Sequence, residues 1–320
     1  MKLAFIIDPI AKLDPGHDTS VALMEAAQIM GHQVWITEAR DLTIVDGKAW
    51  ANLKSVTLKP VQLVNGLWKA ALDWYQIGET TFSCLSEMDA VWMRIDPPVN
   101  TPYLYATYIL DLIDRQKTLV INSPAGLRNA NEKVYALGFT SVIPETIVSQ
   151  DKAVIENFLS QRKAAVLKPL GGKAGEGILF LETVDRNFNS LIEISTKQGS
   201  EPVMVQEYLP AAKEGDKRII LVEGKPIGAV NRIPTGKDFR GNMAVGGSVA
   251  EVAITDRDRE ICEVLAPKLI EDGLYFVGID VIGGYLTEVN VTSPTGIREI
   301  DRLSYVSLGK EVITWLEGKF

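Results

Sequence analysis

The sequence predicts an α/β domain with a parallel sheet, followed by a second unit of mixed α and β structure. Three observations lead to this fold class. The chain opens with two short apolar runs, residues 3–7 and 34–36, which are typical of buried parallel strands. Between them, residues 19–30 carry apolar side chains at helical spacing, so the opening is β-α-β. Further along, apolar runs are joined in pairs by short glycine turns, which indicates antiparallel hairpins.

The elements of the first unit follow from local signals. The helix at 19–30 is stopped by Gly31. A strand at 89–95 ends at an Asp-Pro-Pro run, a helix is expected at 103–115, and a strand at 119–122 closes at Ser-Pro. We therefore expect the first domain to span residues 1–128.

The second unit, residues 129–320, divides into 129–209 and 210–320. The first part begins with a helix and continues with strands around a glycine-rich loop, and the second part contains two hairpins around Gly224 and around Gly283-Gly284. The expected elements are a helix from 131 to 137, strands at 165–168, 178–181, 203–208, 218–222, 226–232, 276–282 and 285–290, a polar loop at 234–247 and a helix at 256–273.

Composition limits the class of protein. A chain of 320 residues suits two or three small domains. The net charge of −8 and the lack of a long basic run argue against non-specific nucleic-acid binding. Cys84 and Cys262 form no CxxC pair, which fits a reducing cytosol rather than a disulfide framework. Asp8 and Pro9 interrupt the first apolar run and no stretch is long enough to span a membrane, so we expect a soluble, cytoplasmic protein.

Several common catalytic motifs are missing from the sequence. It has no P-loop, no strand-linked GxGxxG, no GxSxG elbow and no HExxH. The only histidines are His17 and His32, which excludes a histidine metal cluster. Chemistry based on oxygen ligands remains.

Two features suit the phosphates and base of a nucleotide. Lys168 ends an apolar strand directly before a loop in which Gly171, Gly172, Gly175 and Gly177 would let backbone N–H groups approach phosphates. Alone, a flexible hairpin turn with a solvent-facing lysine is the more common explanation. The strand at 203–208 ends at Leu209-Pro210 and could offer free backbone groups to a base edge, although a strand followed by a linker would look the same.

Two further features carry charge. In the run Asp216-Lys217-Arg218, Arg218 could hold a carboxylate or phosphoryl oxygen and Asp216 could bind ribose hydroxyls, although such runs are usually solvated turns. Asp280 lies inside an apolar strand, where an unpaired carboxylate is rare. Glu288 and Asn290 are two residues apart on the next strand and so share one face. These are hard oxygen ligands, and they favour a Mg²⁺ site.

The four features, in the order in which they follow one another along the chain, resemble those of the ATP-grasp superfamily. Within that superfamily, the chain most resembles the bacterial glutathione synthetases. The resemblance covers nearly the whole chain, and its most specific run is residues 287–295. The similar segments are Asp8-Pro9-Ile10, Asp18-Thr19-Ser20, residues 93–98 and 105–110, Asn131-Glu132-Lys133, residues 167–170 and 215–218, Arg240-Gly241-Asn242 and residues 287–295. The glycine loop departs from the form Asp-Gly-Met-Gly-Gly that some relatives carry.

The resemblance implies a role for each matched position. It implies an ATP site, with Lys133 and Lys168 on the phosphates, and a metal site for Mg²⁺ or Mn²⁺. The ATP site is completed by Gly171, Gly172, Gly175, Gly177, Gln206, Glu207, Tyr208, Leu209 and Asp216. The metal ligands are Asp280, Glu288 and Asn290, and the arginines at the transferred group are Arg218, Arg232 and Arg240. The substrate residues are Asp18, Ser20, Arg94, Asp96, Tyr105, Asn242, Gly246, Gly247, Ser293 and Thr295.

The family reaction joins γ-glutamylcysteine to glycine through an acyl phosphate. Such an intermediate must be kept from water, and residues 233–247 resemble the mobile lid of the family. A homodimer or homotetramer is implied, with no nucleic-acid or membrane partner. Two alternatives stay open at this point. The chain could be an ATP-grasp ligase for another carboxylate and amine, or an ATP-binding module without ligase chemistry.

Overall fold

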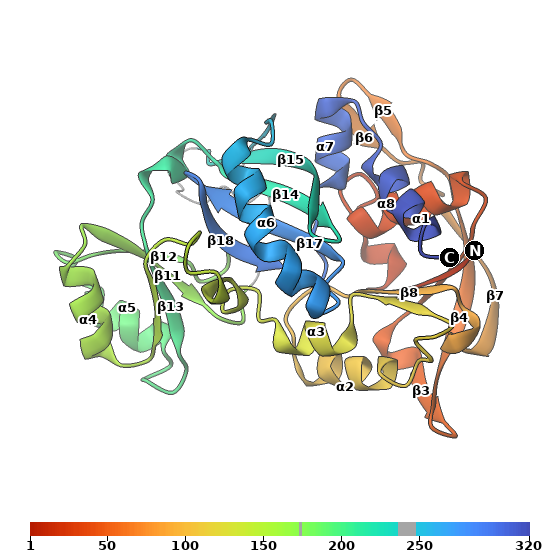
Figure 1. The fold of residues 1–320 in the computed structure, drawn as a ribbon, viewed down its shortest axis with the longest axis horizontal. Helices are drawn as coiled ribbons and strands as arrows, with labels where there is room; N and C mark the ends of the chain where they lie inside the picture. Colours follow the sequence, from red (N-terminus) through yellow and green to blue (C-terminus); the bar gives the residue numbers. More distant parts are fainter. Residues whose placement is uncertain (173–174, 236–247) are drawn as a thin grey trace.

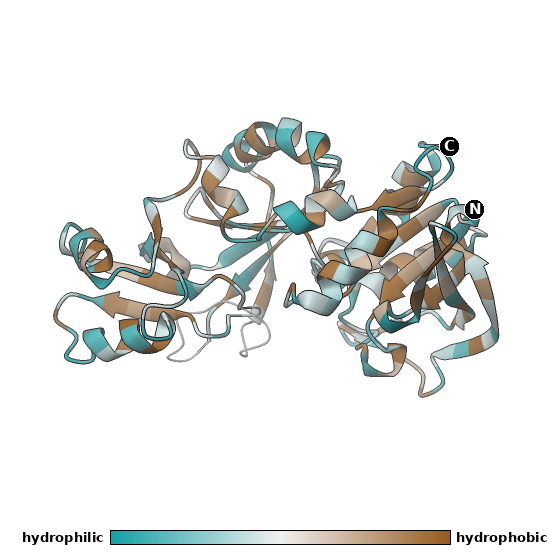
Figure 2. Ribbon diagram, turned by 90° about the horizontal axis from the view of Figure 1, so that it is seen from below, coloured by the Kyte–Doolittle hydropathy of each residue, from teal (hydrophilic) through white to brown (hydrophobic). Residues whose placement is uncertain are grey.

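The fold described here is a computed structural model that covers residues 1–172, 175–235 and 248–320. Within these residues, the chain forms three main sheets, which Figure 1 shows side by side along the long axis of the molecule. A mixed sheet lies in the N-terminal part, and two antiparallel sheets follow. Figure 2 shows that apolar residues are concentrated along the strands, so each sheet has a buried face.

The N-terminal sheet has a parallel half and an antiparallel half. In the parallel half, β1 (Lys2–Ile7) lies between β2 (Gln33–Thr37) and β8 (Ala90–Arg94), and β9 (Leu119–Ile121) pairs with β8. These are the strands that the sequence predicted. The antiparallel half was not predicted and consists of β3 (Leu42–Val45), β4 (Lys48–Leu58) and β7 (Tyr75–Cys84), with β5 (Gln62–Val64) and β6 (Leu67–Lys69) forming a separate hairpin.

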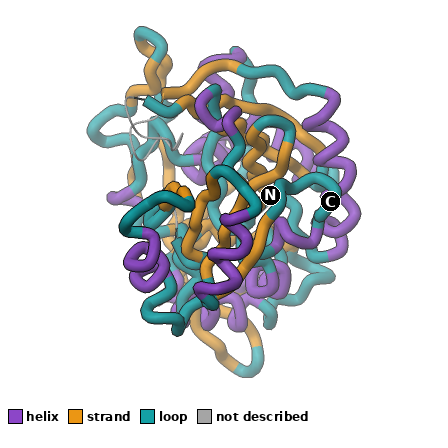
Figure 3. Tube along the Cα trace, turned by 90° about the vertical axis from the view of Figure 1, so that its left-hand side faces the viewer, coloured by secondary structure: helices purple, strands orange, loops and turns teal. Residues whose placement is uncertain are grey.

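Helices from both ends of the chain cover this sheet. The apolar residues of α1 (Thr19–Ile29) and α8 (Leu308–Glu317) belong to one core cluster with β1, so the C-terminal helices return to the N-terminal domain. The two termini lie near each other in Figures 1 and 3. The remaining helices of this region are α2 (Thr101–Leu110), α3 (Pro124–Asn129) and α7 (Ile297–Ser304).

The second sheet has the order β10-β13-β11-β12, and all its pairs are antiparallel. Two helices form one core with it, built from Ile155, Leu159 and Ile192 among other residues. The strands are β10 (Thr146–Ser149), β11 (Ala164–Pro169), β12 (Leu179–Glu182) and β13 (Val203–Glu207), and the helices are α4 (Lys152–Ser160) and α5 (Phe188–Ser195).

The third sheet has the order β16-β15-β14-β17-β18 and is also antiparallel. Figure 1 shows α6 (Asp256–Glu271) lying across it. This helix begins with a capping box between Thr255 and Asp258, which satisfies backbone donors of its first turn. The strands are β14 (Asp216–Val222), β15 (Lys225–Ile233), β16 (Ser248–Glu251), β17 (Phe276–Ile282) and β18 (Tyr285–Asn290).

Two predicted helices have different bounds in the structure. The expected helix at 131–137 is wrong, because a turn followed by a short 3-10 helix, Tyr135–Gly138, takes its place. The Asn131 Oδ1 accepts hydrogen bonds from the N–H groups of Lys133 and Val134, which fixes a side-chain-capped turn in place of helical pairing. The helix expected at 103–115 spans Thr101–Leu110. Other 3-10 turns occupy Ile10–Lys12, Ala39–Asp41, Leu85–Glu87 and Pro210–Lys213.

Candidate active site

A cavity of about 370 Å³ is lined by residues of all three sheet regions. One wall comes from the second sheet and its glycine loop, another from the third sheet, and the end from the N-terminal domain. Eighteen of the residues singled out from the sequence line it: Asp18, Asp96, Lys133, Lys168, Gly172, Gly175, Gln206, Glu207, Tyr208, Leu209, Asp216, Arg218, Arg232, Asp280, Glu288, Asn290, Ser293 and Thr295.

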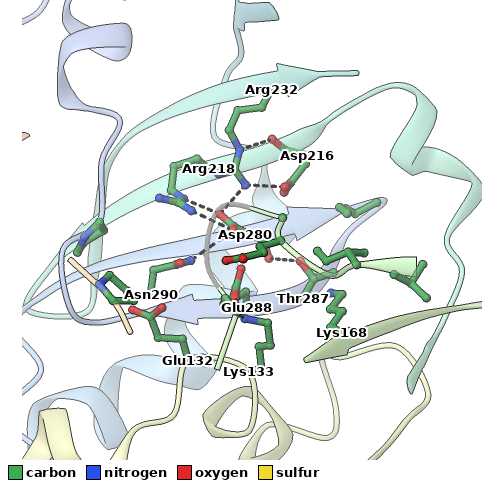
Figure 4. A pocket seen from close by; sticks show the side chains of 18 of the residues that line it. Glu132, Lys133, Lys168, Asp216, Arg218, Arg232, Asp280, Thr287, Glu288 and Asn290 are labelled. Carbon is green, nitrogen blue, oxygen red and sulfur yellow. Dashed lines mark hydrogen bonds and ion pairs between the residues drawn. The ribbon is translucent and has the colours of Figure 1, made fainter. Parts of the chain in front are cut away.

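The centre of the cavity is a network of buried ions on the third sheet (Figure 4). Arg218 lies directly opposite Asp280 in the sheet, and Asp216 lies opposite Arg232. Side chains in such positions share a face and meet. The Arg218 guanidinium donates to both oxygens of Asp280, and Arg232 donates to Asp216 and approaches Asp280 Oδ1 at 2.9 Å.

The arginines set the ionisation of these carboxyls. Burial would raise the pKa of Asp280, but Arg218 and Arg232 outweigh it and hold that pKa well below its ordinary value. Asp280 is therefore a carboxylate at every physiological pH. Asp216 is buried beside the same network, and burial raises its pKa despite Arg232. The difference arises because two arginines bind Asp280, whereas only Arg232 among the described residues donates to the carboxylate of Asp216. The negative charge of Asp280 also raises the pKa of Asp216.

Two lysines connect the second sheet to this centre. Lys133 Nζ lies 3.0 Å from Glu288 Oε1 and donates to the carbonyl of Gly172 at 2.7 Å. Lys168 Nζ donates to Gln206 Oε1 at 2.9 Å, and burial lowers the pKa of Lys168 while Glu288 and Asp216 oppose that shift. Both cations therefore stand where the glycine loop meets the carboxylates of the third sheet.

Two described glycines of the loop have backbone angles that favour glycine. Gly175 and Gly177 have φ values of +82° and +68°, in the left-handed region that glycine adopts without strain. A Cβ on Gly177 would stand 2.8 Å from the ring of Pro169, so the close return of the chain also requires glycine. Gly171 and Gly177 do not line the cavity, whereas Gly172 and Gly175 do.

Other predicted residues lie behind the cavity or outside the described chain. Arg94 is buried and donates to Ser20 Oγ and to the carbonyl of Pro294, so it supports the segment that carries Ser293 and Thr295. Tyr105 is 63% exposed on α2 and does not line the cavity. Arg240, Asn242, Gly246 and Gly247, like most of the predicted lid, lie outside the described residues.

The structure adds residues that the sequence did not single out for a role. Glu132 lines the cavity, and its Oε1 accepts from the N–H groups of Val291 and Thr292 and from the Thr292 hydroxyl. Burial, and then the charge of Glu288, raise the pKa of Glu132. His17 also lines the cavity. Glu132 was part of a matched segment, but nothing in its local pattern indicated that it would reach a segment 160 residues away.

Two features missing from the described residues bear on other kinds of site. No helix among them is long and apolar enough to cross a membrane. They also contain no group of three or more histidine, cysteine, aspartate or glutamate side chains arranged to hold a metal ion. The two cysteines are buried and unpaired, and burial raises the pKa of Cys262 to about 12, which suits an inert thiol.

Comparison with known families covers almost the whole chain. The N-terminal domain of prokaryotic glutathione synthetase matches residues 1–128, and the ATP-grasp domain of prokaryotic glutathione synthetase matches residues 132–305. The chain belongs to the prokaryotic glutathione synthetase family. This confirms the predicted resemblance, and the chain is accordingly an ATP-dependent ligase.

Individual members of the glutathione synthetase family are similar in sequence to this chain over almost their full length. A glutathione synthetase of Thermosynechococcus vestitus is 68% identical over 316 residues, which cover 99% of this chain and 99% of the relative. A glutathione synthetase of a Nostoc species is 67% identical over 317 residues, with 99% and 98% covered. Among solved structures, the ATP-grasp ligase PsnB complexed with a minimal precursor has a TM-score of 0.64 at 17% identity, with 99% of both chains covered. This last match supports the predicted ATP-grasp fold.

Proposed function

We propose that this enzyme joins γ-glutamylcysteine to glycine, consuming Mg-ATP and releasing ADP and phosphate, to form glutathione. The observation that carries this proposal is full-length identity of 68% to a glutathione synthetase, which includes the N-terminal domain as well as the ATP-grasp part. An ATP-grasp ligase for a different carboxylate and amine would share the nucleotide-binding residues. Because it would bind a different substrate, we would not expect it to share the part of the cavity wall that the N-terminal domain forms.

We place the adenine of ATP at the apolar end of the cavity, between the second and third sheets. Val166, Ile178 and Ile282 line this end together with Tyr208 and Leu209. A flat aromatic base suits such a surface. The N–H of Leu209 has no hydrogen-bond partner among the described residues, so it is available to a ring nitrogen. Gln206 and Glu207 complete the strand end, and Asp216 is placed to accept from the ribose hydroxyls.

The phosphates then lie over the four cations Lys133, Lys168, Arg218 and Arg232. Phosphoryl transfer depends mainly on alignment and on charge stabilisation, and fixed cations provide both. The two lysines are held by the carbonyl of Gly172 and the amide of Gln206. The two arginines are held by carboxylates of their own sheet. These partners keep the cations in place before the nucleotide arrives.

The donor set on β17 and β18 fits a Mg²⁺ or Mn²⁺ ion. Asp280 and Glu288 are opposite each other in the sheet, and Asn290 directs its amide nitrogen to Asp280 Oδ2 at 3.3 Å, which leaves its carbonyl oxygen available. Two carboxylates and an amide oxygen are hard ligands, which Mg²⁺ combines with water and substrate phosphates. When bound, the ion would neutralise charge on the phosphate oxygens. We propose Asp280, Glu288 and Asn290 as the residues that hold it.

The chemistry needs no side-chain nucleophile. The cysteinyl carboxylate oxygen forms a bond to the γ-phosphorus as the bond to the ADP oxygen breaks. The glycine nitrogen then bonds to the carbonyl carbon of the acyl phosphate, the bond to the phosphate oxygen breaks, and the nitrogen loses a proton. Arg218 and Arg232 would stabilise the charge of both steps. The N-terminal wall, with Asp18 and Asp96, would hold the dipeptide, and Ser293 and Thr295 border its path.

We propose three further properties of this enzyme. The units 1–128, 129–209 and 210–320 would act as substrate-binding, first ATP-binding and second ATP-binding parts. Buried, unpaired cysteines fit the reducing cytosol, so a cytoplasmic site of action is proposed. A homodimer or homotetramer is proposed from the family resemblance alone.

The test is phosphate release from Mg-ATP with γ-glutamylcysteine, with and without glycine, with the product identified by mass spectrometry. Release that requires both substrates and yields glutathione is expected. Release with another carboxylate and amine, but not with this pair, would refute the substrate assignment and keep the ligase. ATP binding without release for any pair would identify a binding module. Lys133→Ala provides an inactive control protein.

A further inference from the structure

The wall that the N-terminal domain adds to the cavity has its own charge pattern. It contributes His17, Asp18 and Asp96 to the lining. Four other basic side chains among the described residues line the cavity, and all of them lie outside the N-terminal domain: Lys133, Lys168, Arg218 and Arg232. Arg94 belongs to the N-terminal domain, but its guanidinium is directed to Ser20 and Pro294 and does not line the cavity. His17 is therefore the only basic side chain that this wall presents among the described residues.

His17 is fixed in place by a buried carboxylate. Its Nδ1 lies 2.6 Å from Oε1 of Glu299, on the first turn of α7, and the Glu299 side chain is only 8% exposed. The other oxygen, Glu299 Oε2, is buried and has no hydrogen-bond partner among the described residues. An ionised carboxylate is costly to bury unless a cation compensates it. The pair is therefore stable when His17 is an imidazolium.

The groups that face His17 all favour this charged form. The hydrogen bond to Glu299 raises the pKa of His17, burial opposes that shift, and the charges of Glu299, Asp14 and Asp18 raise it further. With Nδ1 occupied by Glu299, Nε2 is the remaining donor of the ring. His17 keeps 39% of its side chain exposed, so an anionic group in the cavity can reach it.

The proposed donor substrate matches this wall in charge. γ-Glutamylcysteine carries two carboxylates and one ammonium group. Its cysteinyl carboxylate must lie at the cations of the ATP-grasp part, because that carboxylate is phosphorylated. Its γ-glutamyl end then extends toward the N-terminal wall, where one cation and two carboxylates, Asp18 and Asp96, would meet a group that has one negative and one positive charge.

We propose that His17, held by Glu299, binds the α-carboxylate of the γ-glutamyl group and thereby selects donors that carry this second carboxylate. The inference rests on the proposed function, because it assigns a residue to one end of the proposed substrate. His17 is a specificity-determining residue, and Glu299 is a positioning residue that acts through it.

The test compares donors that differ by one charge. γ-Glutamylcysteine carries both head groups, 4-aminobutanoyl-cysteine lacks the α-carboxylate, and glutaryl-cysteine lacks the ammonium. We expect His17→Gln to lower kcat/KM for γ-glutamylcysteine by about 10- to 100-fold, the usual range for one charge-assisted hydrogen bond. The rate with 4-aminobutanoyl-cysteine should stay within about 3-fold, because the lost interaction was never made with it. The wild-type preference for γ-glutamylcysteine over 4-aminobutanoyl-cysteine should therefore disappear.

The matched control is His32→Gln. His32 also pairs with a glutamate, Glu317, at 3.0 Å, but it does not line the cavity. Its substitution should leave the donor preference unchanged. In the wild type, the preference for γ-glutamylcysteine over 4-aminobutanoyl-cysteine should fall as the pH rises through the raised pKa of His17. The His17→Lys variant should retain this preference up to about pH 9, because lysine stays protonated there. The Glu299→Gln variant should lose the donor preference at a lower pH than the wild type, because Glu299 raises the pKa of His17.

The outcomes separate the two proposals. If His17→Gln slows both donors equally, or leaves the preference intact, His17 does not bind the α-carboxylate and the inference is wrong. If the wild type does not use γ-glutamylcysteine at all, the proposed function fails instead. Preserved discrimination against glutaryl-cysteine in His17→Gln is the expected sign that Asp18 and Asp96 still hold the ammonium.

Discussion

Replacing Asn122 with alanine should weaken both the fold and the reaction. Asn122 follows the last strand of the parallel half and is only 3% exposed. Its Nδ2 donates to the carbonyls of Phe276 and Val291, each at 2.8 Å, and its Oδ1 accepts from the N–H of Phe276 at 2.8 Å. One side chain thus joins the N-terminal domain to the start of β17 and to the residue after β18.

The expected magnitude follows from the groups that truncation exposes. Three buried backbone groups lose their partner, and a buried polar group left unpaired costs about 1–3 kcal/mol. Partial relaxation or water entry would recover some of this loss, so we expect a loss of about 2–5 kcal/mol in the free energy of unfolding. For a chain of 320 residues, that corresponds to a fall of about 3–7 °C in Tm. Because β17 and β18 carry Asp280, Glu288 and Asn290, kcat should fall more than the KM values rise.

The assay is thermal unfolding at one protein concentration, followed by steady-state kinetics well below the transition. Asn122→Asp retains an acceptor for the Phe276 N–H but places a carboxylate oxygen beside two carbonyls, so it should be no more stable than the alanine variant. Asn129→Ala, at an exposed position seven residues on, is the control and should change stability by less than about 0.5 kcal/mol. A Tm of Asn122→Ala within about 1 °C of the wild type would refute the reasoning.

Three further predictions concern charge. Glu288→Gln should cut turnover at low Mg²⁺ by more than about 100-fold, with partial recovery at high Mg²⁺, and a Mg²⁺ titration of activity checks this. Arg232→Lys should keep ATP affinity within about 3-fold but lower kcat, because an ammonium cannot bridge two carboxylates as a guanidinium does; calorimetry and kinetics separate the two effects. Burial raises the pKa of Asp301 from 3.8 to about 6, so its folded-state charge costs stability above pH 6. Asp301→Asn should then raise stability at pH 8 by about 1–3 kcal/mol and change it little at pH 4, which melting curves at both values would show.

Much of the fold was predictable because the relevant signals are local. The parallel strands, the hairpins of the third sheet and the helix α6 are each marked by apolar runs and by turn or cap residues. The antiparallel strands β3, β4 and β7 were missed. In β4 the buried and exposed residues alternate through most of its length, and most of β7 is exposed, so neither contains the continuous apolar run that marked the other strands.

The site was predictable in part for the same reason. The spacing of Glu288 and Asn290 placed both on one face, and both line the cavity with Asp280. The roles of Glu132, His17 and Asn122 were not predictable. Each depends on a partner more than 150 residues away, as the pairing of His17 with Glu299 illustrates. Such contacts come from the packing of domains, and no local pattern encodes them.

The charge balance of the central ion network favours joint binding of the nucleotide and the proposed metal. Lys133, Lys168, Arg218 and Arg232 are accompanied by Asp216, Asp280 and Glu288, so four cations are nearly neutralised by three carboxylates. Near-neutrality allows the cluster to be buried without a ligand, since an uncompensated buried charge is strongly destabilising. It also means that the cluster alone attracts a polyanion weakly. A divalent ion bound to the carboxylates would free the lysines and arginines for phosphate, so metal and nucleotide should bind with positive coupling.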